Sequence, residues 1–172
     1  MKIVLIGLRG SGKSKIGRLL SEKLGLPLLD LDNEIEKSEN HTISAMVATS
    51  GWAYFREVEK KIVRKFADTK NVIISPGGGA IIDPENRTFL KKDATVIYLK
   101  RLPSECYEWI KSKKNRPSLT GEKDVLRDLK LVYEKRKPVY EKAADIIIER
   151  TEDLEKDTNL IINHLATLSK SQ

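Results

Sequence analysis

Cysteine, histidine and aromatic residues are all scarce in this chain of 172 residues. The single cysteine, Cys106, excludes an internal disulfide and is typical of a reducing compartment, so we expect a cytoplasmic protein. Two scattered histidines and one cysteine predict no transition-metal site. Aromatic residues make up 6% of the chain and are not spaced as a stacking platform, which argues against a nucleic-acid-binding module.

Long apolar runs are also missing. No segment approaches the roughly 20 apolar residues that a membrane span requires, so we expect no membrane partner. The apolar stretch at the N-terminus runs directly into a glycine-rich loop and does not resemble a secretory signal. Charge is abundant instead, with a net charge of +7, but Lys and Arg alternate with Asp and Glu along most predicted helices. This pattern favours small anionic substrates over nucleic acid. The length of the chain predicts a single domain over residues 1–172, and we expect a monomer.

The first fourteen residues, MKIVLIGLRGSGKS, carry the strongest functional signal. The apolar run over residues 3–6 predicts a buried parallel strand, and residues 7–14 match the phosphate-binding loop pattern in full. Glycines let backbone N–H groups converge on phosphate oxygens, and a helix starting near Lys15 adds its positive dipole. A chance glycine-rich turn is the alternative, but the strand and the helix around the loop favour a nucleoside triphosphate. We expect its contacts at Gly10, Ser11, Gly12, Lys13, Ser14 and Lys15.

Two acidic residues end the next predicted strand, Leu28 to Asp32. Residues two apart on a strand face the same side, so Asp30 and Asp32 should point together at the carboxyl edge of the sheet, where ligands bind. One carboxylate is suited to the neighbourhood of Mg²⁺, and the other to accepting a proton from an attacking hydroxyl. The alternative is that Asp32 only caps a helix from Asn33 to Ser38.

Thr42 is predicted to cap a short helix that ends before Gly51, and a longer amphipathic helix should run from Trp52 to Ala67. On the longer helix Arg56 and Glu59 lie three residues apart and are in reach of each other. A surface ion pair is the default interpretation of these two residues. Charge in the N-terminal half of this helix also makes the helix a candidate substrate-binding flap.

Three consecutive glycines, Gly77 to Gly79, follow the predicted strand over residues 71–75. Such a run is costly in conformational entropy, and a plain turn needs fewer glycines. The run therefore favours a ligand that approaches the backbone closely.

The segment over residues 111–123 contains Lys, Asn, Pro and Gly and almost no apolar residue. It is either a solvated linker or a mobile, positively charged lid, in which Arg116 would neutralise the charge of a transferring phosphoryl group. The helix after it is predicted from Asp124 to about Lys137, ending near Pro138. Arg136 lies on the apolar stripe of that helix, so it either extends its charged end to solvent or pairs with a carboxylate or phosphate.

Strands and helices alternate to the end of the chain, with further strands predicted over residues 94–99 and 145–149 and a closing helix over 152–168. This order predicts an α/β fold in three layers, with a five-stranded parallel sheet covered by helices on both faces.

The ordered set of motifs resembles the shikimate kinase family of P-loop kinases over nearly the whole chain. Six motifs carry the resemblance: the phosphate loop Gly7 to Ser14, Asp30/Asp32, Phe55-Arg56 with Glu59, the glycines 77–79, Arg116-Pro117, and Arg136 with Pro138 and Tyr140. The resemblance implies transfer of the γ-phosphoryl group of ATP to the 3-hydroxyl of shikimate, with Mg²⁺ as cofactor, in aromatic amino-acid biosynthesis.

The resemblance also implies roles for single residues. Lys13, Asp32 and Arg116 would be catalytic, and Asp32 would orient or deprotonate the attacking hydroxyl. Ser14 and Asp30 would hold Mg²⁺. Acceptor binding would fall to a helical segment of about 33–62 and the residues around it, and a lid of about 111–124 would bring Arg116 to ATP. The implied acceptor site comprises Asp32, Arg56, Glu59, Gly77, Gly78, Gly79 and Arg136.

The chain departs from the family pattern at three positions. Ser118 replaces a larger apolar residue after the lid proline, and Lys15 replaces a common threonine. Trp109 lies seven residues before Arg116, where many members have an arginine against adenine, and adenine contacts are otherwise expected around residues 150–153. Other functions also fit parts of the pattern: a gluconate kinase, a nucleoside monophosphate kinase, or a nucleotide-binding regulatory module without catalysis.

Overall fold

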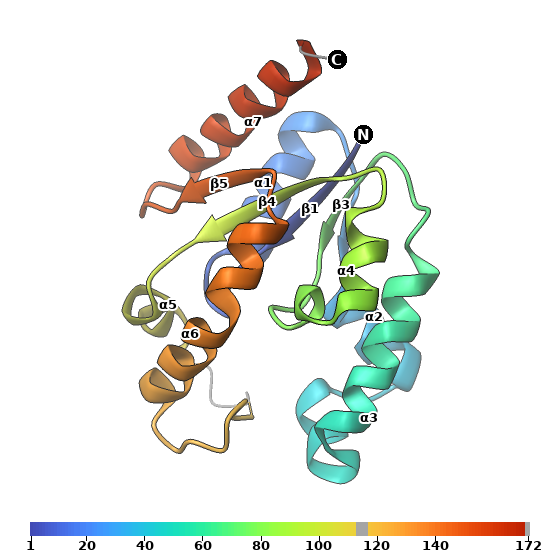
Figure 1. Ribbon diagram of the computed structural model, residues 1–172, viewed down its shortest axis with the longest axis vertical. Coiled ribbons are helices and arrows are strands. Elements are labelled where there is room, and N and C mark those ends of the chain that lie inside the picture. The colour runs from blue at the N-terminus through green and yellow to red at the C-terminus, as the bar shows by residue number, and fades with distance from the viewer. Residues whose placement is uncertain (113–116, 171–172) are drawn as a thin grey trace.

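Five parallel strands form one sheet in the order β2-β3-β1-β4-β5 (Figure 1). The structure is a computed structural model that describes residues 1–112 and 117–170. The strand of the phosphate loop, β1, lies at the centre between β3 and β4. The strands are β1 (Lys2–Ile6), β2 (Leu28–Asp30), β3 (Val72–Ser75), β4 (Thr95–Lys100) and β5 (Ile146–Glu149). The predicted five-stranded parallel sheet is confirmed.

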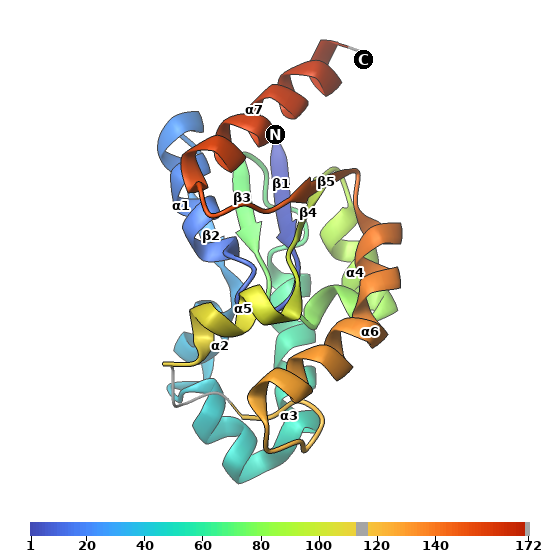
Figure 2. The same cartoon turned by 90° about the vertical axis from the view of Figure 1, so that its left-hand side faces the viewer.

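Helices cover both faces of the sheet, as Figure 2 shows with α1 and α7 on one side and α4 and α6 on the other. Side chains alternate along β1, so Val4 and Ile6 pack under α3, α4 and α6, while Ile3 and Leu5 pack under α1 and α7. None of the described helices has both the length and the apolar content that crossing a membrane requires. The helices are α1 (Lys13–Leu24), α2 (Leu31–Glu39), α3 (Ile43–Lys65), the 3-10 turn η1 (Ala80–Ile82), α4 (Pro84–Lys91), α5 (Pro103–Ile110), α6 (Val125–Ala143) and α7 (Leu154–Lys170).

The strand β2 is shorter than predicted, and the two acids after it do not share a strand face. β2 ends at Asp30, whose side chain accepts hydrogen bonds from the backbone N–H groups of Asp32 and Asn33 at 3.1 and 3.4 Å. Asp30 is therefore the N-cap of α2, and Asp32 lies in its first turn. The cap competes successfully with strand extension because it satisfies two backbone donors at once.

The helix α6 does not end near Pro138 as predicted but continues to Ala143. Proline inside a helix removes one hydrogen bond and costs about 3 kcal/mol. The continuation is offset by burial, because Tyr140 and Ala143 are both buried and the ring of Tyr140 packs on Tyr98 with centroids 5.2 Å apart. Tertiary packing thus overrides the local signal.

The break at Gly51 is where the sequence predicts it. Thr42 caps the first part of α3 by accepting a hydrogen bond from the backbone N–H of Ala45 at 3.2 Å. Gly51 has φ 78° and ψ 172°, which interrupts the helix and divides it into two parts.

Candidate active site

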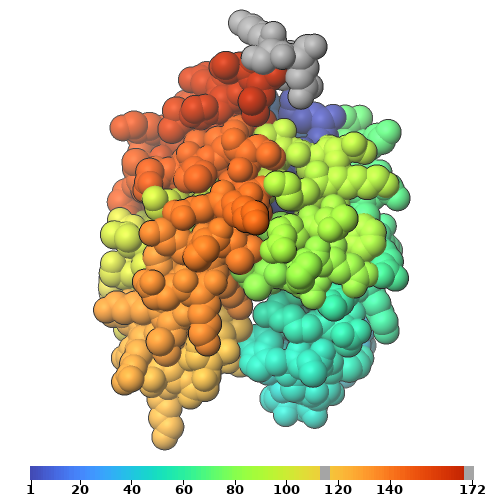
Figure 3. All heavy atoms as spheres, viewed as in Figure 1, coloured from blue at the N-terminus to red at the C-terminus, as the bar shows by residue number. Residues whose placement is uncertain are grey.

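A cavity of about 620 Å³ lies at the carboxyl ends of the strands. Figure 3 shows the surface hollowed between α3 and α6 on this side of the molecule. Its walls come from the phosphate loop, the first turn of α2, the two parts of α3, residues 75–79 and α6. Segments far apart in the chain therefore meet at the edge where open parallel sheets bind ligands.

The phosphate loop has the strained backbone that its glycines allow. Gly10 and Gly12 have φ values of 85° and 94°, and a Cβ atom on Gly10 would lie 2.6 Å from the carbonyl oxygen of Cys106. Lys13 folds back over the loop and donates from Nζ to the carbonyl oxygens of Gly7 and Leu8 at 3.0 and 3.1 Å. The loop residues that line the cavity are Gly10, Gly12, Lys13, Ser14 and Lys15. Ser11 is fully buried and does not line the cavity.

Ser14 and Asp30 lie together at the rim of the loop. The hydroxyl of Ser14 donates to Oδ2 of Asp30 at 3.2 Å. The two oxygens fit Mg²⁺, which takes hard oxygen ligands and is commonly held by one or two protein groups plus water and phosphate. Within residues 1–112 and 117–170 no group of three or more His, Cys, Asp and Glu side chains forms a complete metal cage.

Asp32 reaches the cavity from the first turn of α2. A Cβ atom on Gly77 would lie 2.6 Å from its Oδ1 atom, so the missing side chain of Gly77 makes room for this carboxylate. Asp32 is therefore positioned by the turn after β2, and the capping role that was its alternative belongs to Asp30.

Arg56 and Glu59 form an ion pair in which Nη1 of Arg56 donates to both carboxylate oxygens of Glu59, at 2.7 and 2.9 Å. The side chain of Glu59 is only 2% exposed, so the default interpretation as a surface pair is wrong. Burial raises the pKa of Glu59 above its usual value, and the negative charge of Asp32 raises it further. The positive charges of Arg56 and Arg136 lower this pKa but do not cancel the rise. A Cβ atom on Gly79 would lie 2.6 Å from Nη2 of Arg56, so the guanidinium packs directly on this glycine.

Arg136 faces the cavity from α6, opposite the same group of residues. One turn further on, the hydroxyl of Tyr140 donates to the carbonyl oxygen of Gly78 at 2.6 Å. A Cβ atom on Gly78 would lie 3.1 Å from the carbonyl oxygen of Gly7. Tyr140 thus connects α6 to the glycine run, which itself packs against the phosphate loop.

Arg116 lies outside the described residues, but the segment that follows it is held by a buried carboxylate. Asp128 accepts hydrogen bonds from the Ser118 hydroxyl at 2.9 Å and from the backbone N–H groups of Leu119 and Thr120 at 3.1 and 2.9 Å. Burial alone would raise the pKa of Asp128, but the hydrogen bonds from Thr120, Ser118 and Leu119 outweigh it and keep the pKa below its usual range. Ser118, which departs from the family pattern, therefore has a partner that the sequence did not reveal.

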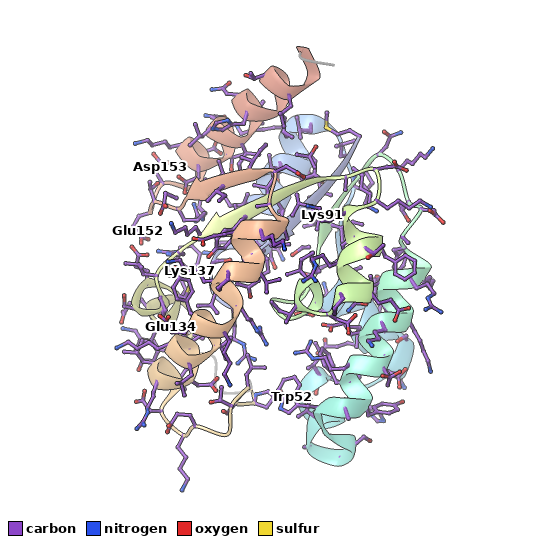
Figure 4. All side chains as sticks on the ribbon, viewed as in Figure 1. Trp52, Lys91, Glu134, Lys137, Glu152 and Asp153 are labelled. Atoms are coloured by element: carbon purple, nitrogen blue, oxygen red, sulfur yellow. The ribbon has the colours of Figure 1, made fainter. Side chains whose placement is uncertain are left out.

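The structure adds several cavity residues that sequence reasoning missed. Arg9 lines the cavity and donates from Nη1 to the carbonyl oxygen of Pro117 at 3.2 Å. Trp52, which the sequence placed only on a core-facing stripe, also lines the cavity and projects from α3 toward the segment before α6 (Figure 4). Trp109, which the sequence analysis did single out as a departure from the family pattern, borders the cavity, and the ammonium group of Lys15 lies 4.1 Å from its ring centre. Arg9 stands at a variable position of the loop pattern, so no motif singled it out.

A triphosphate on the glycine loop and a hydroxylated acid against Arg56 would meet inside one cavity, with Asp32 between them. This arrangement, on a parallel sheet with the loop after β1, is that of a P-loop small-molecule kinase. The sequence model of the shikimate kinase family matches residues 9–166, and the chain belongs to this family.

Two relatives support the assignment. The chain is 40% identical to a shikimate kinase of Persephonella marina over 141 residues. The aligned residues make up 82% of this chain and 84% of that protein. It also superposes with a TM-score of 0.90 on a shikimate kinase from Acinetobacter baumannii solved in complex with shikimate, at 30% identity over 99% of this chain and 94% of that one.

The gluconokinase of Sinorhizobium meliloti shows how much of the likeness is fold alone. Its structure superposes over 99% of this chain and 94% of that one with a TM-score of 0.58, but at 16% identity. This likeness shows a shared fold and does not indicate which acceptor the chain binds.

Proposed function

We propose that this chain transfers the γ-phosphoryl group of ATP to the 3-hydroxyl of shikimate, giving shikimate 3-phosphate and ADP in aromatic amino-acid biosynthesis. The observation that carries the proposal is the ion pair between Arg56 and the buried carboxylate of Glu59, which packs on the glycine run inside the same cavity as the phosphate loop. A guanidinium held by a buried carboxylate, with Arg136 across from it, suits a planar carboxylate on a small acceptor. The family match gives the identity of that acceptor.

At the nucleotide end, the backbone N–H groups from Gly10 to Ser14 would receive the phosphates, and Lys13 would exchange its two loop carbonyls for phosphate oxygens. ATP-dependent kinases of this kind require Mg²⁺ in general. We assign its protein ligands to Ser14 and Asp30, and the ion would neutralise charge on the phosphates. Lys15 borders the same end of the cavity.

At the acceptor end, Asp32 would accept the proton of the attacking hydroxyl as its oxygen bonds to the γ-phosphorus and the bond to the β-phosphate oxygen breaks. Arg56 and Arg136 would bind the acceptor carboxylate, and Glu59 would keep Arg56 in place. The backbone of the glycine run would meet the ring hydroxyls. Asp32 is suited to orienting the attacking hydroxyl and to accepting its proton, because the absence of a side chain on Gly77 leaves the carboxylate unobstructed.

The remaining assignments rest on the family resemblance. Arg116 would stabilise the transferring phosphoryl group from a lid of about 111–124, and residues of about 33–62 would form the acceptor-binding segment. We assign all of these parts to a single domain over 1–172, acting as a monomer in the cytoplasm with ATP and shikimate as its small-molecule partners.

The test is release of ADP from Mg-ATP with shikimate, with gluconate and with no acceptor, measured in parallel. The proposal expects release that depends on shikimate. Release with gluconate alone would keep the fold and overturn the acceptor assignment. Binding of ATP without stimulated release by either acid would favour a regulatory module.

A further inference from the structure

Arg150 is a buried cation behind the phosphate loop to which the proposed reaction gives no role. It follows β5 directly, and its side chain is 0% exposed. Its Nε atom donates to the carbonyl oxygen of Ser11 at 3.1 Å, across a separation of 139 residues. Its guanidinium also covers Gly12, because a Cβ atom there would lie 3.1 Å from Nη2. The side chain therefore touches the loop on the face opposite the cavity.

Asp157 holds the other side of this guanidinium. It lies early in α7, is 2% exposed and forms an ion pair with Arg150. Asp157 also accepts hydrogen bonds from the backbone N–H and the hydroxyl of Thr151, at 3.0 and 2.9 Å. A buried guanidinium is costly unless it is paired. Here Asp157 on α7 is ion-paired with Nη1 and the loop accepts a hydrogen bond from Nε, whereas Nη2 has no hydrogen-bond partner among the described residues.

The bond to Ser11 has a consequence on the cavity side of the loop. In a trans peptide the carbonyl group and the next N–H group point in opposite directions. A carbonyl oxygen of Ser11 directed at Arg150 therefore directs the N–H group of Gly12 away from Arg150, toward the cavity that Gly12 lines. Gly12 has φ 94°, and glycine permits other orientations of this peptide at little cost, so the loop by itself does not select this one.

We propose that Arg150, held by Asp157, is a positioning residue for the phosphate loop: it keeps the Ser11–Gly12 peptide oriented with its N–H group toward the nucleotide phosphates. The inference rests on the proposed function only in that the loop takes ATP. It assigns to β5 and α7, which contribute no residue to the acceptor site, a specific part in nucleotide binding.

The test compares Arg150→Lys and Asp157→Asn with the unchanged chain. Lysine retains a positive charge but lacks the Nε donor and the forked geometry, and asparagine retains the shape of Asp157 without its charge. We expect the dissociation constant for Mg-ADP, measured by calorimetry without shikimate, to rise roughly tenfold in Arg150→Lys and less in Asp157→Asn. The KM for ATP should rise in parallel, while kcat and the KM for shikimate stay near their original values, because the lost interaction is present in both the ground and transition states.

The matched control is Lys2→Met, which removes another buried cation at the opposite end of the sheet. It should lower the melting temperature and leave the affinity for Mg-ADP unchanged. Unchanged affinity for Mg-ADP in both test variants, with only a lower melting temperature, would overturn the inference, as would an equal loss of shikimate affinity. If Arg150→Lys does not fold, Asp157→Asn decides alone. Since the ADP titration contains no acceptor, its outcome is independent of whether shikimate is the substrate.

Discussion

Charged side chains have different partners at the two ends of the sheet. At the amino end, the buried ammonium group of Lys2 donates to three carbonyl oxygens, of Ala67, Phe89 and Lys92, at 2.7, 3.3 and 3.1 Å. The carbonyls of Phe89 and Lys92 lie at the end of α4, and that of Ala67 lies just after α3, so all three are close to helix ends, which leave acceptors without partners. The cation therefore completes structures that would otherwise expose unsatisfied groups to the interior.

At the carboxyl end, the cations and carboxylates instead border a cavity, and glycines remove the side chains that would fill it. Arg56 packs on Gly79, and Asp32 faces Gly77, each within 3 Å of where a Cβ atom would stand. Here the charged groups are positioned for a molecule that the protein binds, whereas Lys2 is positioned for the protein itself. The difference predicts that substitutions at the two ends separate activity from stability.

The largest effect is expected for Asp32→Asn, which removes the proton acceptor and keeps the size of the side chain. Turnover should fall by about 10²–10⁴-fold, the usual contribution of a positioned general base, while Mg-ATP still binds. The measurement is kcat from ADP release, with nucleotide affinity by calorimetry as the control. Near-normal turnover would mean that Asp32 is not the base.

The next largest effect is expected for Arg136→Ala. Losing a charge-assisted hydrogen bond of about 1.5–3 kcal/mol should raise the KM for shikimate by roughly ten- to a hundredfold and alter nucleotide affinity little. The neighbouring exposed lysine supplies a matched control, since Lys135→Ala removes a cation from the same helix on its solvent side. Equal KM values for the two variants would remove Arg136 from the acceptor site.

A change at the amino end should affect stability alone. Lys2→Met leaves three carbonyl oxygens without their donor, so we expect the free energy of unfolding to fall by about 1–3 kcal/mol. Urea unfolding measures this loss, and steady-state kinetics in the folded range should give unchanged KM values. A raised KM for either substrate would show that the two ends are coupled.

The smallest effect concerns the pH dependence of stability. Burial raises the pKa of Glu59 above its ordinary value of 4.5, so the folded state binds the proton more tightly than the unfolded state. The stabilisation that proton binding by Glu59 adds to the free energy of unfolding is therefore fully present below pH 4.5. It is lost as the pH rises through the pKa of Glu59 in the folded state. Glu59→Gln does not titrate, so its free energy of unfolding should lack this decline. Urea unfolding at a series of pH values tests it, and parallel curves for the two proteins would contradict the assignment.

Local motifs were predictable because their geometry depends on residues close in the chain. The phosphate loop, the break at Gly51 and the cap at Thr42 all form from neighbouring residues, and the structure has each where the sequence predicts it. The errors arose where a local rule met a competing interaction. Pro138 predicts a helix end, but the packing of Tyr140 carries α6 past it. At β2 two local signals compete, and the helix cap formed by Asp30 ends the strand.

The α/β class, the nucleotide loop and the residue types shared with the family were readable from the chain alone, because each depends on contiguous motifs or on the alternation of strands and helices. Three other features required the folded structure: the burial of Glu59, the bond between Asp128 and Ser118, and the contact of Arg150 with the phosphate loop. These contacts depend on which distant segments pack together. Burial and pairing, unlike a glycine-rich turn, are properties of that packing and leave no local pattern in the chain.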